Sequence, residues 1–146
     1  MFKRILLATD GSAASENAAR TAVELARAHG ARLTAVYVVD PYPYLGIGEA
    51  NPMGFDAYMA AARDHAAQAH TRVTQLAGGP GEALDVQLRL VEDVSALDGI
   101  LNTARDEGAD LIVVGSHGRS GVGRVFLGSV AGKVVAQSKV PVLVVR

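Results

Sequence analysis

The sequence predicts an α/β fold built on a parallel sheet. Two observations carry this prediction: short apolar runs alternate with helical patterns along the chain, and three of those runs are continuously apolar. Continuous apolar runs are typical of parallel strands that are buried on both faces. The chain has 146 residues, which is the length of one domain, so we expect a single domain over residues 1–146.

The first half of the chain is predicted to contain two strands and two helices. Residues 5–8 are continuously apolar and form the first strand. Ser12 is a suitable N-cap for an alanine-rich helix over 13–29, whose small apolar side chains fall on one stripe. The second strand covers residues 33–39, and a second helical pattern covers residues 55–77.

The second half repeats this alternation. The run at 84–91 alternates apolar and polar residues, which predicts a strand near an edge of the sheet with one solvated face. A helix over 96–107 leads to a continuously apolar strand at 111–114. A last helix over about 130–137 precedes the final strand at 142–145, which is again continuously apolar.

Residues between these elements carry their own signals. Ser95 is placed to cap a helix, and Gly30 and Gly108 are placed to end one. The connection over 40–54 is unusually long for a compact domain. Both a lid over a ligand and a mobile segment fit a connection of this length.

The order of elements limits the topology. Right-handed crossovers favour a single-domain, Rossmann-like five-stranded parallel sheet of flavodoxin-like order, with helices on both faces. In such sheets, ligands bind beyond the carboxyl ends of the strands, where the strand order reverses. The loops after the first and fourth strands, at 9–12 and 115–128, are therefore expected to be neighbours.

The loop after the fourth strand carries a glycine pattern. Gly115 and Gly118 are followed, after nine further residues, by Gly128 and Ser129. A strand before the loop and a helix after it favour a phosphate site, because helix N-terminal N–H groups gather around anions. A mobile glycine-rich surface loop is the alternative reading.

Composition excludes several classes of protein. The net charge of −1 gives no general attraction to nucleic acid, so we expect no nucleic-acid partner. The absence of cysteine removes disulfides and thiolate chemistry. No apolar run approaches the ~18–20 residues of a membrane span, and the run after the N-terminus is shorter than a signal-peptide core. A cytoplasmic protein without a membrane partner is expected.

Four stretches of the chain together resemble a known family. The chain resembles the universal stress protein family, specifically its ATP-binding branch, and it carries the pattern G-x2-G-x9-G-(S/T) without a gap. The resemblance runs over essentially the whole chain. The matching stretches are residues 5–12, 109–118, 128–130 and 140–145.

The resemblance implies a bound adenine nucleotide, which is ATP or else ADP or AMP, together with Mg2+. Asp10 resembles the acidic residue near the ribose and the phosphate-bound metal, and the backbone of Val39 resembles the group that reads the adenine edge. Gly128, Ser129 and Val130 resemble the phosphate anchors. The predicted nucleotide-binding set is Thr9, Asp10, Gly11, Ser12, Val39, Gly115, His117, Gly118, Arg119, Gly128, Ser129 and Val130.

Some of these residues also have a purely local interpretation. A carboxylate repels bare phosphate, so Asp10 suits ribose hydroxyls or Mg2+, but a turn aspartate before Gly11 is the alternative. His117 either contacts phosphate or shapes the loop, and Arg119 and Arg124 either neutralise phosphate or are solvated. The loop at 91–94 has no glycine where many family members carry one, which puts the ligand contacts there in doubt.

The leading hypothesis for function is an ATP-binding universal stress protein that acts as a nucleotide-dependent sensor or regulator. The sequence contains no Walker A, dinucleotide or nucleotidyl-transferase signature, and no catalytic residue is assigned. A slow ATPase or autophosphorylating enzyme is the first alternative, and a nucleotide-independent dimeric interaction module is the second. The resemblance also implies a homodimer through the strand at 142–145. His65 and His70 are interpreted as surface residues of the second helix.

Overall fold

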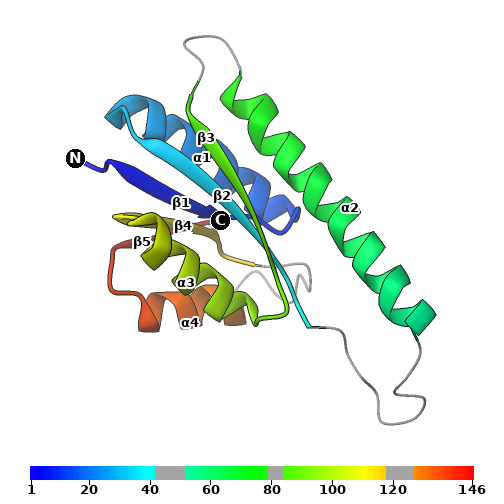
Figure 1. Ribbon diagram of the computed structural model, residues 1–146. Coiled ribbons are helices and arrows are strands. Elements are labelled where there is room, and N and C mark those ends of the chain that lie inside the picture. Colours follow the sequence, from blue (N-terminus) through cyan, green and yellow to red (C-terminus); the bar gives the residue numbers. More distant parts are fainter. Residues whose placement is uncertain (42–51, 79–83, 118–126) are drawn as a thin grey trace.

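The computed structural model describes residues 1–41, 52–78, 84–117 and 127–146. In this part of the chain, all strands run parallel in one five-stranded sheet of order β3-β2-β1-β4-β5 (Figure 1). The predicted α/β, flavodoxin-like fold class is confirmed. The strands are β1 (Arg4–Ala8), β2 (Arg32–Val39), β3 (Val86–Glu92), β4 (Leu111–Gly115) and β5 (Val142–Val145), and the helices are α1 (Ala13–His29), α2 (Pro52–Ala77), α3 (Ala96–Glu107) and α4 (Ser129–Gln137).

Every element predicted from the sequence is present. The largest differences in position are the start of α2, at Pro52 instead of 55, and the start of β3, at Val86 instead of 84. Element boundaries are the weakest part of a sequence-based assignment, because end residues satisfy either state. The capping predictions are also confirmed. Ser12 accepts a hydrogen bond from a backbone N–H in the first turn of α1, and Gly30 ends that helix in the left-handed conformation.

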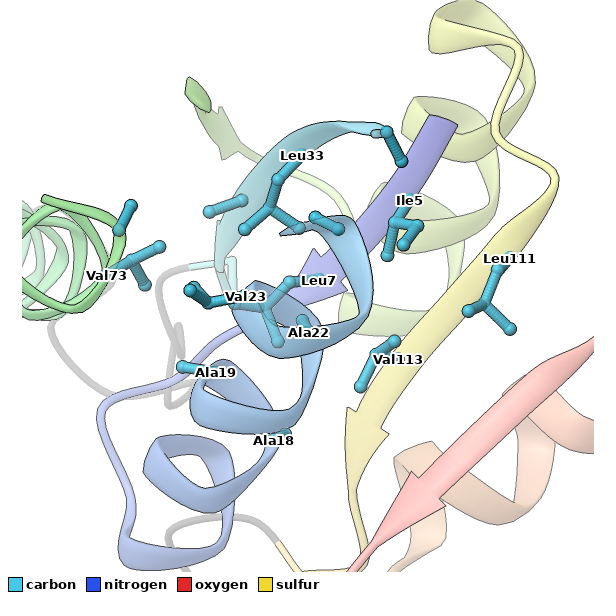
Figure 2. Packing of buried hydrophobic residues seen from close by; sticks show 14 residues of the cluster. Ile5, Leu7, Ala18, Ala19, Ala22, Val23, Leu33, Val73, Leu111 and Val113 are labelled. Atoms are coloured by element: carbon cyan, nitrogen blue, oxygen red, sulfur yellow. The ribbon is translucent and has the colours of Figure 1, made fainter. Parts of the chain in front are cut away.

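One face of the sheet packs against α1 and α2. Side chains that alternate along β1, β2 and β4 point to this face, as the period of two requires. Figure 2 shows Ile5 and Leu7 of β1 directed at the small residues of α1, of which Ala18 and Ala22 are fully buried. Because alanine side chains are short, α1 can approach the sheet closely.

The opposite face packs against α3 and α4. Its core includes Leu6 of β1, Ile112 of β4 and Val134 of α4, each with less than 2% of its surface exposed. A Cβ built on Gly99 would lie 2.6 Å from a methyl of Val38, so α3 and β2 are closer than an alanine at this position would permit. Helices on both faces explain why the central strands are continuously apolar.

The two edges of the sheet are β3 and β5. The edge position that the alternating run predicted for β3 is confirmed. Its Leu88 and Leu90 pair in register with Ala35 and Tyr37 on the α2 face, yet each remains 43% exposed. None of the helices in the described part of the chain combines the length and apolarity that a bilayer crossing requires.

The strand order positions the site. From β1, the chain runs through β2 to β3 on one side of the sheet and returns to β4 and β5 on the other. The connections that leave β1 and β4 therefore depart to opposite faces from adjacent strands, which opens a crevice at their carboxyl ends.

Candidate functional site

A cleft of about 540 Å3 lies at the carboxyl ends of β1, β2 and β4. The ends of these strands form its floor, and described residues of α2, α3 and α4 form its walls. Pockets of roughly 300–1,000 Å3 hold small molecules. The cleft sits at the reversal of strand order, where open α/β sheets bind their ligands.

The β1–α1 turn forms the middle of the floor and satisfies its own backbone. The Ser15 hydroxyl, which is buried, accepts hydrogen bonds from the N–H groups of Asp10 at 3.3 Å and Gly11 at 3.2 Å. The Ser15 hydroxyl also forms a hydrogen bond with the Thr9 hydroxyl, at 3.0 Å. The Ser12 N–H donates to Asp10 Oδ1 at 2.8 Å, so Asp10 serves as a turn residue while it also lines the cleft.

The two described ends of the β4–α4 connection line one wall of the cleft and are joined by a hydrogen bond. The Gly128 N–H donates to the Ser116 carbonyl at 2.6 Å, directly before α4 begins. A Cβ on Gly128 would lie 2.8 Å from that carbonyl oxygen, so this approach needs glycine. Gly128 is the N-cap of α4 and supplies no side-chain cap. The first-turn N–H groups of α4 therefore have no side-chain acceptor of their own and open toward the cleft.

Small apolar side chains line the opposite wall. Ala61 and Ala62 of α2 face the cleft. On the other face of the sheet, Val38 of β2 and Ile100 of α3 add apolar surface to it. Short side chains leave room for a flat ring between α2 and the end of β2. This wall is apolar and the α4 wall is polar, which suits a ligand with an apolar ring at one end and an anion at the other.

Tyr58 closes the outer part of the apolar wall. Its hydroxyl donates a hydrogen bond to the Asp40 carbonyl at 2.9 Å, which ties α2 to the residue after β2. Partial burial raises the pKa of the Tyr58 phenol, and the nearby Asp40 carboxylate raises it further. The phenol therefore stays protonated at neutral pH and keeps its donor role.

The charged groups of the cleft are few. The described lining residues include Asp10, Asp40, His65 and His117 but no lysine or arginine. Attraction for an anion in this part of the chain must therefore come from the α4 N–H groups and its helix dipole. Within the described ranges, no three His, Asp or Glu side chains gather as a metal site would require.

The structure brings most of the predicted nucleotide-binding residues into this one cleft. The described residues of the predicted set that line it are Thr9, Asp10, Val39, Gly115, His117, Gly128, Ser129 and Val130. Gly11 and Ser12 belong to the adjoining turn and do not line it. Gly118 and Arg119 lie outside the described residues, as do Arg124 and most of the long 40–54 connection.

The sequence reasoning missed the α2 wall. Tyr58, Ala61, Ala62 and His65 all line the cleft from α2. Their spacing of three, four and seven residues is that of one helix face. That stripe was readable in the sequence, but nothing in it distinguishes a face that meets a ligand from one that meets core.

The loop after β3 behaves differently from the expectation that it borders the ligand. Glu92 receives two hydrogen bonds from the Arg63 guanidinium, at 2.9 and 3.2 Å, which hold the pKa of its carboxyl below the ordinary value. Neither Glu92 nor Asp93 lines the cleft. Asp93 has φ = +63°, the left-handed conformation that glycine adopts most easily. The absent glycine thus changes local backbone strain and leaves the described cleft lining unaltered.

The reading of His70 as a surface residue is wrong. Only 9% of its surface is exposed, whereas His65 on the same helix is exposed. The sequence places these two side chains about 140° apart around the helix, since each residue turns it by 100°. One side chain can therefore face the sheet while the other faces solvent, and in α2 it is His70 that faces inward.

The chain is an open, parallel α/β domain with a polar and an apolar wall at its switch point, which is the place where such sheets commonly bind small molecules. The chain belongs to the universal stress protein family, which it matches over residues 1–146. It is 43% identical over 148 residues to the universal stress protein in QAH/OAS sulfhydrylase 3′ region of Thermus aquaticus, with 100% of both chains covered.

Solved structures agree with this assignment. Universal stress protein UspA from Lactobacillus plantarum matches with a TM-score of 0.82 and 28% identity, over 99% of this chain and 97% of that one. A universal stress protein in complex with cAMP matches with a TM-score of 0.68 and 28% identity, again over 99% and 97%. The family resemblance seen in the sequence is therefore confirmed.

Proposed function

We propose that this protein binds an adenine nucleotide and acts as a nucleotide-dependent sensor or regulator in a stress response. ATP is the proposed main ligand, and ADP or AMP are its alternatives. The observation that carries the proposal is that the uncapped N-terminus of α4 opens into the same cleft as a wall of small apolar side chains. A similar family member forms a complex with cAMP, which contains the same base.

Each wall has a proposed part of the nucleotide. The base lies between α2 and the end of β2, next to Val39, whose backbone is proposed to meet the adenine edge. The phosphates lie at Gly128, Ser129 and Val130, where the helix N-terminus favours negative charge. Ribose lies between them, next to Asp10 and Gly115.

Mg2+ fits this arrangement through Asp10. The ion is commonly held by one or two carboxylates together with substrate phosphates, so one carboxylate in the cleft is sufficient. The Ser12 N–H donates to Asp10 Oδ1 and fixes the direction of that carboxylate. When bound with the nucleotide, the ion would neutralise phosphate charge beside the Asp10 side chain.

Thermal unfolding with Mg-ATP tests the proposal. A ligand that binds only the folded state stabilises it by about 2.7 kcal/mol at a free concentration about 100 times Kd, so the melting temperature should rise by several degrees. No rise at millimolar Mg-ATP would overturn it and favour a nucleotide-independent module. Release of ADP during the same incubation would instead favour a slow ATPase.

A matched pair of variants locates the phosphate end. Ser129 and Ala13 are the exposed first residues of α4 and α1, and an aspartate at either position benefits its own helix dipole. Ser129→Asp should remove the Mg-ATP stabilisation because it places a carboxylate where phosphate belongs. Ala13→Asp should retain it, since Ala13 does not line the cleft. Equal loss in both variants would contradict the placement.

We further propose a homodimer formed through β5, in a protein located in the cytoplasm. The N–H of Ile112 in β4 donates to the Pro141 carbonyl, and the N–H of Ser116, directly after β4, donates to the Val145 carbonyl. Val142 and Val144 therefore turn their backbone polar groups outward from the sheet edge. An open apolar edge is a template for pairing with another chain.

Light scattering at micromolar concentration tests the dimer. Val144→Pro removes an outward N–H without removing a bond to β4, so it should convert a dimer to a monomer. Val144→Thr keeps that N–H and is the control. A monomeric wild-type protein would contradict the proposed dimer.

A further inference from the structure

His70 is a buried histidine with an unsatisfied ring nitrogen. It lies on the sheet-facing side of α2 with 9% of its surface exposed. Its Nε2 atom is fully enclosed and has no hydrogen-bond partner among the described residues. A buried nitrogen without a hydrogen-bond partner lowers the free energy of unfolding, so its presence in the core requires an explanation.

The surroundings of His70 favour the neutral ring. Tyr37 of β2 meets it edge-on, with ring centroids 6.4 Å apart, and His70 forms no ion pair with a carboxylate in the described part of the chain. Desolvation lowers the pKa of His70 below its ordinary value of 6.5 and outweighs the backbone groups of Ala35 and Arg89, which act in the opposite sense.

Several charged side chains on the elements that pack around α2 form ion pairs with partners other than His70. On β3, the Arg89 guanidinium donates to Glu107 of α3 at 2.6 Å. On α1, Glu16 accepts from Arg72 of α2 at 2.8 Å and from Arg20 at 2.8 Å. None of the groups that shift the pKa of His70 is a carboxylate, so a charged ring would need contact with water.

The helix that carries His70 also positions the cleft. Tyr58 and His65 of α2 line the cleft, and so does Tyr37, the aromatic partner of His70. Ala69, adjacent to His70, lies 3.8 Å from the place that a Cβ of Gly11 would occupy, so α2 also packs against the turn that carries Asp10. A shift of α2 therefore alters two walls of the cleft together.

We propose that His70 is an acid-sensitive positioning residue: its neutral ring seats α2 against the sheet, and its protonation releases α2 and lowers the affinity of the cleft for its ligand. The folded state holds the ring neutral, whereas the unfolded or released state takes up a proton near pH 6.5. The released state thus binds more protons below that pH, so the seated state loses stability as pH falls from 6.5 toward the folded pKa.

Hydrogen exchange without nucleotide tests the release of α2 by itself. After correction for intrinsic exchange rates, protection of α2 amides relative to those of β1 and β4 should fall at least about fivefold between pH 7.5 and 5.5, the lower end of ordinary couplings. In His70→Phe, which keeps an aromatic ring against Tyr37 and cannot titrate, this ratio should stay constant. His70→Leu serves if the phenylalanine variant does not fold. An unchanged ratio in the wild-type protein would overturn the proposal.

Calorimetric titration with Mg-ATP tests the link to the cleft, which rests on the proposed function. The wild-type affinity should fall between pH 7.5 and 5.5 by at least about fivefold more than that of His70→Phe, which shares the titration of the ligand's own phosphates. His29→Gln, which removes a histidine of α1 that does not line the cleft, should retain the wild-type loss. Equal pH dependence in wild type and His70→Phe would overturn the link. Absence of binding at pH 7.5 would contradict the proposed nucleotide function and leave the exchange result to decide on His70.

Discussion

The β1–α1 and β4–α4 connections are the same kind of unit, a strand followed by a turn and a helix, and they lie side by side at the switch point. They differ in where their helix N-terminal N–H groups find acceptors. In the first unit, Ser12 caps α1, and the Ser15 hydroxyl accepts from the N–H groups of Asp10 and Gly11 in the turn before the helix. In the second, Gly128 precedes α4 and offers no side-chain cap.

This difference separates a structural turn from a binding turn. A helix that caps itself has little to offer an anion, whereas an uncapped one leaves donors for a ligand. The β1–α1 turn is therefore a rigid floor that presents the Asp10 side chain. The β4–α4 connection is the part whose unmet donors call for a ligand.

The largest expected effect on this comparison comes from Gly115→Ala. A Cβ at Gly115 would lie 2.9 Å from the backbone carbon of Ala14 and 3.1 Å from the Ser15 nitrogen, so the two units would be forced apart. Overpacking of this kind costs about 1–3 kcal/mol and occasionally more. Urea unfolding should show this loss, together with weaker Mg-ATP binding. Full stability in the variant would mean that the units can separate freely.

Ser12→Ala should have an intermediate effect, confined to the first unit. Loss of an N-cap typically costs about 1 kcal/mol. Because the Ser12 side chain does not line the cleft, Mg-ATP affinity measured by calorimetry should stay close to the wild-type value. A loss of affinity larger than the loss of stability would show that the cap also holds Asp10 in place.

Ser129→Ala should have the smallest effect on stability and the opposite pattern. Ser129 is exposed and is not the N-cap, so its removal should change the free energy of unfolding by less than about 0.5 kcal/mol. A hydroxyl that contacts phosphate contributes about 1.5–3 kcal/mol as a hydrogen bond to a charged group, so Mg-ATP affinity should fall about tenfold or more. Unchanged affinity would leave the backbone donors as the sole phosphate contacts.

The sequence predicted the fold well because each strand carried a local signal. Continuous apolar runs at β1, β4 and β5 and alternation at β3 are consequences of where the helices lie, so the pattern and the architecture agree. Capping residues such as Ser12 and Gly30 could also be predicted, because each one ends a helix through its own side chain or backbone conformation, which local sequence determines.

The site could be predicted only in part. The phosphate wall could be predicted because the glycine pattern that indicates it lies within a single loop of the sequence. The α2 wall depends on how this helix packs against a strand that is distant in the sequence. The sequence pattern of Tyr58 and His65 therefore could not show that this helix face lines the cleft. A second role of Gly115 could not be predicted for the same reason. The missing Cβ makes room for the start of α1, which lies a hundred positions away in the sequence.

The hydrogen bond between Gly128 and Ser116 has a consequence for how this protein can change over time. It joins the two ends of the segment between them at a fixed point beside α4. Once the ends of a loop are fixed, doubling its length costs only about 0.6 kcal/mol in closure entropy. A change in the number of residues between Ser116 and Gly128 should therefore cost little stability, while this hydrogen bond keeps the start of α4 beside the end of β4.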